Sequence, residues 1–155
     1  MKMKIRNALT EDFEFILDLT RRNMERIVTE EWNADWEKDI EPNFVKLWEM
    51  QGEKKIIEVD NRRVGYFWFE QHPEKKEIFI NSIQIVEQFQ RKGVGTEVID
   101  GLLKEAMNHN LEFIRGMVQK TNIHAKKFFE KSRFKFIEET KSGILIERGL
   151  KENTR

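Results

Sequence analysis

The sequence predicts an α+β fold in which a mostly antiparallel sheet of six to seven strands is flanked by about four helices. Apolar residues recur at helical spacing in two long segments, 10–28 and 95–107. Between and after them lie shorter segments of strand length that alternate or are continuously apolar. Three of these, 54–59, 63–69 and 77–86, follow one another without an intervening helix, which indicates an antiparallel meander.

Composition limits the class of protein. The 155 residues suit one domain, 1–155, with a charged tail at 151–155 that we expect to be frayed. The absence of cysteine excludes disulfides and thiolate chemistry and fits a reducing cytoplasm. Acidic and basic residues balance at 28 each, so net charge gives no reason to expect a nucleic-acid partner. No apolar run reaches the roughly 18 residues of a membrane span, and no signal peptide is recognisable, so we expect a cytoplasmic protein without a membrane partner.

The N-terminal third is expected to hold a strand and two helices. The strand covers residues 3–8, with Ile5 as its apolar anchor. Thr10 has the character of a helix N-cap, and the helix that follows should run to about Val28. Its apolar stripe consists of Phe13, Ile16, Leu17, Met24 and Ile27. Pro42 suits the start of a second, short helix within an acidic segment that also holds Trp32, Trp36 and Trp48.

A hairpin and a long strand form the predicted centre of the sheet. Asp60-Asn61-Arg62 reads as the turn between the strands 54–59 and 63–69, and Gly65 suggests a bulge or a close backbone approach. Period two places side chains on opposite faces: Tyr66, Trp68 and Glu70 on one, Phe67 and Phe69 on the other. In the strand 77–86 the alternation puts Ile83 and Ile85 on one face and Ser82 and Gln84 on the other.

The turn after this strand has the character of an anion site. Gly93 and Gly95 precede a helix that opens at Gly95 or Thr96, and a helix N-terminus carries unpaired N–H groups and a positive partial charge. Glycines leave room for a phosphate, and Arg91 and Lys92 add positive charge. The turn therefore predicts a phosphate or pyrophosphate site.

The C-terminal third is expected to alternate strands and one helix. The helix that opens at the glycines should end near 108–110 and be followed by a strand at 112–119. Thr121 or Asn122 should cap the next helix, 123–132, in which Ile123, Phe128 and Phe129 point inward. A strand begins at Phe134, and a turn over 138–143 leads to the last strand, 144–146.

Two motifs resemble those of the GNAT N-acetyltransferases. Gln90-Arg91-Lys92-Gly93-Val94-Gly95 is similar to the family's [Gln/Arg]-x-x-Gly-x-[Gly/Ala] acyl-CoA loop. The segment Asn122-Ile123-His124-Ala125-Lys126-Lys127-Phe128-Phe129-Glu130-Lys131-Ser132-Arg133-Phe134 is similar to Asn-x-x-Ala-x-x-[Leu/Phe]-Tyr-Glu-Lys-x-Gly-Phe. The resemblance extends from about Met3 to Leu150.

The resemblance implies the GNAT acyl-CoA N-acyltransferase fold and acetyl-CoA as cofactor. It implies a bulge in the central strand and a V-shaped gap beside it, where the backbone of Ile85 and Val86 bonds the pantetheine arm and an amide polarises the thioester carbonyl. The other cofactor residues implied are Gln90, Arg91, Lys92, Gly93, Val94, Gly95, Thr96, Asn122, Ala125, Phe128 and Lys131. A homodimer is common in the family.

In GNAT relatives the segment between the first two strands often forms a wall of the acceptor cleft. Trp32 and Trp36 would then line the substrate site, and the acids around them would attract a cationic amine. The alternative is that the tryptophans pack in the core and the acids form a solvated face. The acceptor would be a primary amine of a small molecule or peptide, attacking acetyl-CoA directly in a ternary complex.

The catalytic residues are less well defined. Phe129 stands where the motif has the tyrosine that serves many GNAT enzymes as general acid, and Arg133 replaces the motif's glycine. Glu77 is the first choice for the base, with Gln84 and Asn81 as water-holding alternatives and Glu70 or Glu31 as further candidates. The three histidines show no metal-ligand spacing, so no metal is expected. The alternatives to an acetyltransferase are a non-catalytic acyl-CoA-binding module and a nucleotide-phosphate-binding α/β domain.

Overall fold

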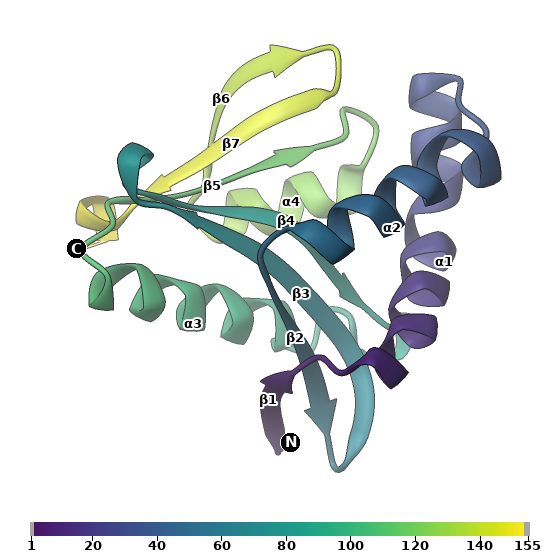
Figure 1. Ribbon diagram of the computed structural model, residues 1–155. Helices are drawn as coiled ribbons and strands as arrows, with labels where there is room; N and C mark the ends of the chain where they lie inside the picture. Colours follow the sequence, from purple (N-terminus) through teal and green to yellow (C-terminus); the bar gives the residue numbers. More distant parts are fainter. Residues whose placement is uncertain (1, 154–155) are drawn as a thin grey trace.

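A computed structural model describes residues 2–153 and contains a seven-stranded sheet in the order β1-β2-β3-β4-β5-β7-β6 (Figure 1). Every neighbouring pair is antiparallel except β4 and β5, which are parallel. The strands are β1 (Met3–Asn7), β2 (Glu53–Val59), β3 (Arg62–His72), β4 (Glu77–Ile85), β5 (Phe113–Val118), β6 (Lys135–Thr140) and β7 (Gly143–Gly149). The predicted α+β class and the antiparallel meander are confirmed.

Four α-helices cover the sheet: α1 (Phe13–Trp32), α2 (Glu41–Met50), α3 (Val94–Asn108) and α4 (Ile123–Lys131). Residues of α3 and α4 pack into one apolar core, which includes Phe67 and Phe69 of β3. Residues of α1 and α2 pack into a second core with Tyr66 and Trp68. The alternation predicted along β3 therefore assigns its two faces correctly, and the sheet lies between two helical layers. We call the side that carries α1 and α2 the α1/α2 face.

Several predicted details are wrong. The strand β1 is anchored by Met3, which packs against the core, whereas Ile5 is 40% exposed. Ile123 is 60% exposed at the start of α4, and among the residues of α4 the fully buried one is Phe129. The helix α1 continues to Trp32 and ends at Asn33, which adopts a left-handed φ of 51°. The apolar stripe does not predict the last turn of α1, beyond Val28, because polar contacts hold that turn in place.

The C-terminal hairpin is longer than predicted. The strand β6 continues to Thr140 and β7 begins at Gly143, so the predicted turn over 138–143 shrinks to 141–142. Residues Leu150–Asn153 form a short 3₁₀ helix in the segment expected to be frayed, and the last two residues of that prediction lie outside the described chain. Among the described helices, none combines the length and apolarity needed to cross a membrane.

The sheet splits between β4 and β5. Their parallel pairing runs from Glu77 opposite Phe113 to Ile80 opposite Gly116 and then stops, although β4 continues to Ile85. The register of β3 with β4 shifts at the same point, so that Asn81 is an additional residue in β4, a β-bulge. Figure 1 shows β4 and β5 diverging, with α1 standing beside the open end of the V. The bulge and the V-shaped gap implied by the resemblance are both present.

Candidate active site

The N-terminus of α3 lies where β4 leads out of this gap. Gly93 is its N-cap, with a φ of 88°, and no side chain caps the helix. The first bond of the turn runs from the N–H of Glu97 to the carbonyl of Gly93, at 3.0 Å. The N–H groups of the three residues between them, Val94, Gly95 and Thr96, thus point out of the helix end without an intrahelical acceptor. A Cβ on Gly93 would meet nothing within 4 Å, so these donors are open to an anion.

The two cations of the turn have different surroundings. Arg91 has a φ of 62°, and its guanidinium lies 3.3 Å from Nδ1 of His124, the second residue of α4. Lys92 is exposed, and its Nζ lies 5.6 Å from the centre of the Phe89 ring. Arg91 therefore connects the turn to α4, while Lys92 stays at the surface beside the open helix end.

Gly95 is a glycine for a reason that the sequence does not reveal. A Cβ there would lie 2.9 Å from two ring atoms of Phe128 in α4. The missing side chain thus allows α3 and α4 to approach each other, rather than making room for a phosphate. Val94 is buried in the core, so that only its backbone is available to a ligand.

Replacing Gly95 with alanine is expected to destabilise the protein by about 1 kcal/mol, because overpacking against Phe128 outweighs the better helix propensity of alanine. The double variant Gly95→Ala, Phe128→Leu should recover part of this loss, since leucine lacks the ring atoms that collide. Urea unfolding of the natural protein, the two single variants and the double variant measures the coupling. Strictly additive effects would contradict the assigned contact.

The backbone of Val86 is hydrogen-bonded within the protein. Its N–H donates to the carbonyl of Val64 at 2.8 Å, and its carbonyl accepts the N–H of Phe89 at 2.9 Å. In an antiparallel ladder, alternate residues point their backbone groups at the same neighbour. Because Val86 points at β3, Ile83 and Ile85 point away from β3 and into the gap. The N–H of Val86 is thus engaged within the protein, and Ile83, which the sequence did not single out as a cofactor residue, faces the gap together with Ile85.

The carbonyl of Ile85 already has two donors. One is Nδ2 of Asn23 in α1, at 3.1 Å, and the other is Nε2 of Gln90, at 2.8 Å. Gln90 thus fastens the turn to the end of β4 rather than facing outward. In the described part of the chain, the N–H groups of β4 that face the gap beyond its pairing with β5 are those of Ile83 and Ile85. Asn23 had no signal in the sequence, because it belongs to a helix that reads as core.

The start of α4 forms the other side of the gap. Asn122 is the N-cap, and its Oδ1 accepts the N–H of Ala125 at 3.1 Å, as predicted. Ala125 and Phe128 are partly buried against the core. Lys131 follows Phe128 by one turn on the same side of the helix and is exposed. The contacts of Phe128 with Gly95 and of His124 with Arg91 bring α4 to the turn, and Lys131 lies farther along the helix.

Phe129 and Arg133 stand where the motif has other residues. Phe129 packs edge-on against Phe128 and Phe134 at about 5 Å between ring centres, so it is a core residue and cannot donate a proton. Arg133 has a φ of 69°, a left-handed conformation that glycine adopts without strain. The glycine of the motif is thus explained by backbone geometry, and Arg133 retains the same conformation here.

Glu31 acts as a connection between α1 and the segment before α4. Its carboxylate accepts the N–H groups of Lys120 and Thr121, at 2.9 and 2.8 Å, and the Thr121 hydroxyl at 2.8 Å. Burial alone would raise the pKa of Glu31, but these hydrogen bonds outweigh it and hold the pKa below its usual value. These three hydrogen bonds stabilise the ionised carboxylate of Glu31 and hold α1 to the segment before α4.

A directional hydrogen-bond chain joins α1 to β3 and β4 beside the bulge. The Thr20 hydroxyl donates to the carbonyl of Ile16, so the Tyr66 hydroxyl must donate to Thr20. Ser82 then donates to Tyr66 at 3.0 Å, Gln84 donates to Ser82 at 3.2 Å, and Asn23 donates to Gln84 at 3.1 Å. Both ends of the Gln84 amide are therefore engaged. Burial raises the pKa of Tyr66, the only tyrosine, to about 12, which makes it a poor proton donor.

A second chain of polar side chains lies farther along the α1/α2 face. Asn81, the bulge residue, donates to Glu70 at 2.8 Å, and the other oxygen of Glu70 lies 3.0 Å from Nε2 of His72. Nδ1 of His72 lies 2.7 Å from Glu77, whose second oxygen accepts from Arg115 at 3.0 Å. Glu77 is only 5% exposed at its side chain, so the residue chosen as base does not face solvent.

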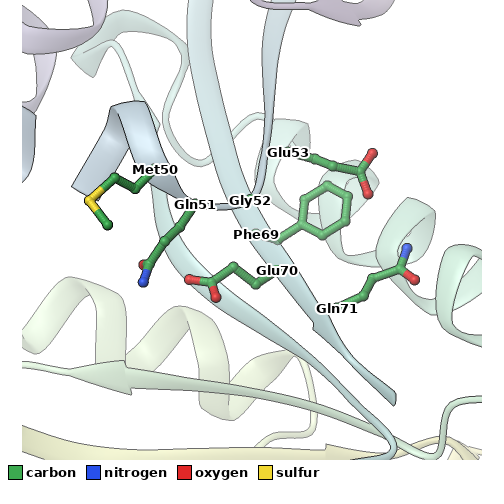
Figure 2. A pocket seen from close by; sticks show the side chains of 7 residues that line it. All are labelled: Met50, Gln51, Gly52, Glu53, Phe69, Glu70 and Gln71. Atoms are coloured by element: carbon green, nitrogen blue, oxygen red, sulfur yellow. The ribbon is translucent and has the colours of Figure 1, made fainter. Parts of the chain in front are cut away.

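The tryptophans divide between surface and core. Trp36 is 3% exposed and donates to Glu41 at 3.2 Å, so it packs inside, as the alternative interpretation proposed. Trp32 is 38% exposed at the end of α1. A shallow hollow of about 310 Å³ lies between the end of α2 and β3. Figure 2 shows its lining, with Gln51 and Glu70 extending to one side of β3 and Phe69 and Gln71 to the other.

A split sheet beside an uncapped helix end defines a site for an extended anionic ligand. A model of the acetyltransferase (GNAT) family matches residues 13–134. The chain therefore belongs to the GNAT acetyltransferase family, as its two motifs predicted, and is an N-acetyltransferase of that type. The sheet, with its single parallel pair among the described strands, lacks the alternating βαβ units of a nucleotide-binding α/β domain.

Solved structures agree on the fold. The PaiA N-acetyltransferase of Thermoplasma acidophilum, in complex with coenzyme A, has a TM-score of 0.75 at 16% identity, covering 96% of this chain and 99% of that one. Ard1 from Thermoplasma volcanium has a TM-score of 0.73 at 18% identity, covering 96% and 98%. The ribosomal-protein-S18-alanine N-acetyltransferase of Escherichia coli has a TM-score of 0.67 at 15% identity, covering 96% and 94%. No curated protein sequence gives a significant match.

Proposed function

We propose that the protein transfers the acetyl group of acetyl-CoA to a primary amine of a small molecule or peptide, by direct attack in a ternary complex. The observation that carries this proposal is the continuity of the gap with the helix end. The N–H groups of Ile83 and Ile85 face the gap between β4 and β5, and the chain leads from the end of β4 to the uncapped N-terminus of α3. A ligand with an amide-bearing arm and a pyrophosphate matches both parts.

The residues present fit this cofactor. The N–H groups of Val94, Gly95 and Thr96 would hold the pyrophosphate, and Lys92 would neutralise part of its charge. The N–H of Ile85 would bond the pantetheine arm. Acetyl-CoA supplies an activated acetyl group. The N–H of Ile83, two residues nearer the bulge, would bond the carbonyl oxygen of that group and stabilise the negative charge that develops on it.

The leaving thiolate needs little help. Neither Phe129 nor Tyr66 is suited to protonate it, the first because it lacks a hydroxyl and the second because its hydroxyl donates to Thr20. A thiol has a pKa of about 8.5, so the thiolate can leave and take its proton from water. The protein must mainly hold the acetyl group, polarise it, and receive a proton from the amine.

The cofactor site is tested by a single charge at the open helix end. Thr96 is exposed in the first turn of α3. A carboxylate there stabilises the helix but repels phosphate, so Thr96→Glu should weaken acetyl-CoA binding by about tenfold or more. Thr96→Gln, which has the same size without the charge, should bind within a few-fold of the natural protein. Isothermal titration with acetyl-CoA measures both.

Acetyl transfer is then followed by release of free coenzyme A in the presence of ethanolamine, 1,4-diaminobutane or an alanyl tripeptide. Amine-dependent release by the natural protein and its loss in Thr96→Glu support the proposal. Equal binding by Thr96→Glu and Thr96→Gln would remove the helix end from the cofactor site. Binding of acetyl-CoA without release in the presence of any of the amines would instead favour a non-catalytic binding module.

A further inference from the structure

The chain Asn81–Glu70–His72–Glu77–Arg115 connects the bulge to the interior of the sheet. Its contacts measure 2.8, 3.0, 2.7 and 3.0 Å in that order, and Arg115 continues to Glu147 of β7 at 2.8 Å. The groups come from β3, β4, β5 and β7, and neighbouring partners are held by short hydrogen bonds. Within this chain a proton can pass between the carboxylates and the imidazole, whereas Asn81 and Arg115 only donate hydrogen bonds to it.

Access to solvent varies along the chain. The side chain of Glu77 is 5% exposed, whereas those of Glu70 and His72 on one side of it are 19% and 27% exposed, and those of Arg115 and Glu147 on the other side are 23% and 22% exposed. Glu70 also lines the hollow drawn in Figure 2. At the open end, Asn81 lies two residues, about 7 Å along the strand, from the gap-facing N–H of Ile83. Of the two carboxylates that contact His72, the more accessible one, Glu70, is therefore also the one nearer the site proposed for the acetyl group.

The net charge of this hydrogen-bonded chain favours a cationic substrate. Glu70, Glu77 and Glu147 carry three negative charges, against one on Arg115 and a second on His72 when it is protonated. A primary ammonium group would thus be attracted to the open end. Charged residues around the chain include Lys54, whose charge acts on Glu70, and Glu74, Lys75 and Lys76, which are exposed in the turn between β3 and β4.

We infer that Glu70 contacts the acceptor amine and passes the proton it loses to His72, and that Glu77 and Arg115 hold the imidazole for this step. This inference rests on the proposed function. An ammonium group loses two protons when it becomes an amide: one passes through Glu70 to His72, and the other is released to water, which in turn protonates the thiolate that leaves as the C–S bond breaks. His72 then returns its proton to solvent. Glu70 is the catalytic residue, and His72, Glu77 and Arg115 are positioning residues.

The electrostatics agree with a proton held on the imidazole. Hydrogen bonds from His72 to Glu77 and then Glu70 raise the pKa of His72 above its usual 6.5, with burial opposing them. Burial raises the pKa of Glu70, but the bonds from His72 and Asn81 outweigh this and lower it. A proton that reaches Glu70 therefore moves on to His72. Only protein molecules in which His72 is neutral can accept this proton. Activity should rise with pH through the pKa of His72.

The first test follows the imidazole directly, without a substrate. In a protein with labelled histidine, NMR titration should give His72 a pKa above 6.5, with the signal assigned by its absence in His72→Gln. Glu77→Gln keeps the hydrogen bond but removes the charge, so the pKa of His72 should fall. A His72 that titrates at or below 6.5 in the natural protein would overturn the inference.

The second test measures kcat/KM against pH with acetyl-CoA and the best of the three amines. Glu70→Gln and His72→Gln should each lose about a hundredfold in kcat/KM. In Glu77→Gln the rising limb should move to lower pH together with the pKa of His72. Glu74→Gln, which changes an exposed acid two residues after His72, should change neither kcat/KM nor the position of the rising limb. If the rising limb of the kcat/KM profile stays at the same pH while the pKa of His72 moves, the inferred proton transfer from Glu70 to His72 is overturned.

Titration with acetyl-CoA separates this inference from the proposed function. Glu70→Gln, His72→Gln and Glu77→Gln should each bind acetyl-CoA as the natural protein does, because none of these residues is among those proposed to hold the cofactor. A natural protein that neither binds acetyl-CoA nor acetylates an amine overturns both proposals before any variant is compared. A natural protein that does both, with relay variants equally active, overturns the relay alone.

Discussion

Replacing Gly65 with alanine is expected to lower the free energy of unfolding by about 3 kcal/mol. A Cβ at this position would lie 2.5 Å from the carbonyl oxygen of Gln84 and 3.2 Å from Cα of Ile85. Both are backbone atoms of β4, so no side-chain rotation can relieve the contact. β3 and β4 would have to separate. Because β4 also forms one wall of the gap, this wall would be displaced as well. Urea unfolding measures the loss of stability.

A matched glycine provides the control. Gly101 lies inside α3, and a Cβ there would meet nothing within 4 Å. Gly101→Ala should therefore stabilise the protein by up to about 1 kcal/mol, because alanine is the better helix former. We also expect Gly65→Ala to bind acetyl-CoA more weakly than Gly101→Ala under conditions where both are folded. Equal stability of the two variants would refute the close approach of β3 to β4.

Replacing Asp12 with asparagine is expected to cost about 3 kcal/mol, because it leaves two arginines without their buried anion. The side chain of Asp12 is 1% exposed. It accepts two bonds from Arg6, at 2.8 and 3.0 Å, one from Arg63 at 3.2 Å and one from the N–H of Leu9 at 2.7 Å. These contacts join β1 and β3 to the start of α1. Glu11→Gln, an exposed acid in the same turn, is the control and should change little.

The same carboxylate predicts a pH dependence of stability. The hydrogen bond from Arg6 lowers the pKa of Asp12 from 3.8 to about 2, with burial opposing and the N–H of Leu9 assisting. Because the folded pKa is below the unfolded one, this stabilisation, about 2 kcal/mol, is complete above pH 3.8 and disappears as the pH falls toward 2. The difference in stability between the natural protein and Asp12→Asn should be constant near neutral pH and narrow below pH 4. A difference independent of pH down to 2 would contradict the assignment.

The local sequence determined the fold class, most helices and strands, and the family. Periodicities of two and about 3.6 residues reflect which side of an element is covered, and they assigned Tyr66 and Phe67 to opposite layers correctly. The glycine turn and the capping Asn122 are defined by local backbone chemistry, so they could be recognised from neighbours in the chain. Where only hydrophobicity was available, as for Ile5 and Ile123, the prediction was wrong, because an apolar residue at the end of an element need not be covered.

Tertiary structure alone decided which atoms face the gap and which side chains meet. The register of β4 with β3 directs the backbone of Val86 at Val64 and that of Ile85 at the gap, and this depends on where the bulge lies. Gly95 faces Phe128, 33 positions later, and Glu77 faces Arg115, 38 positions later. Local periodicity carries no information about such partners, because the pairing of distant strands and helices sets them. The sequence therefore defined the family and the turn, while the relay on the α1/α2 face became visible only once β3, β4 and β5 lay side by side.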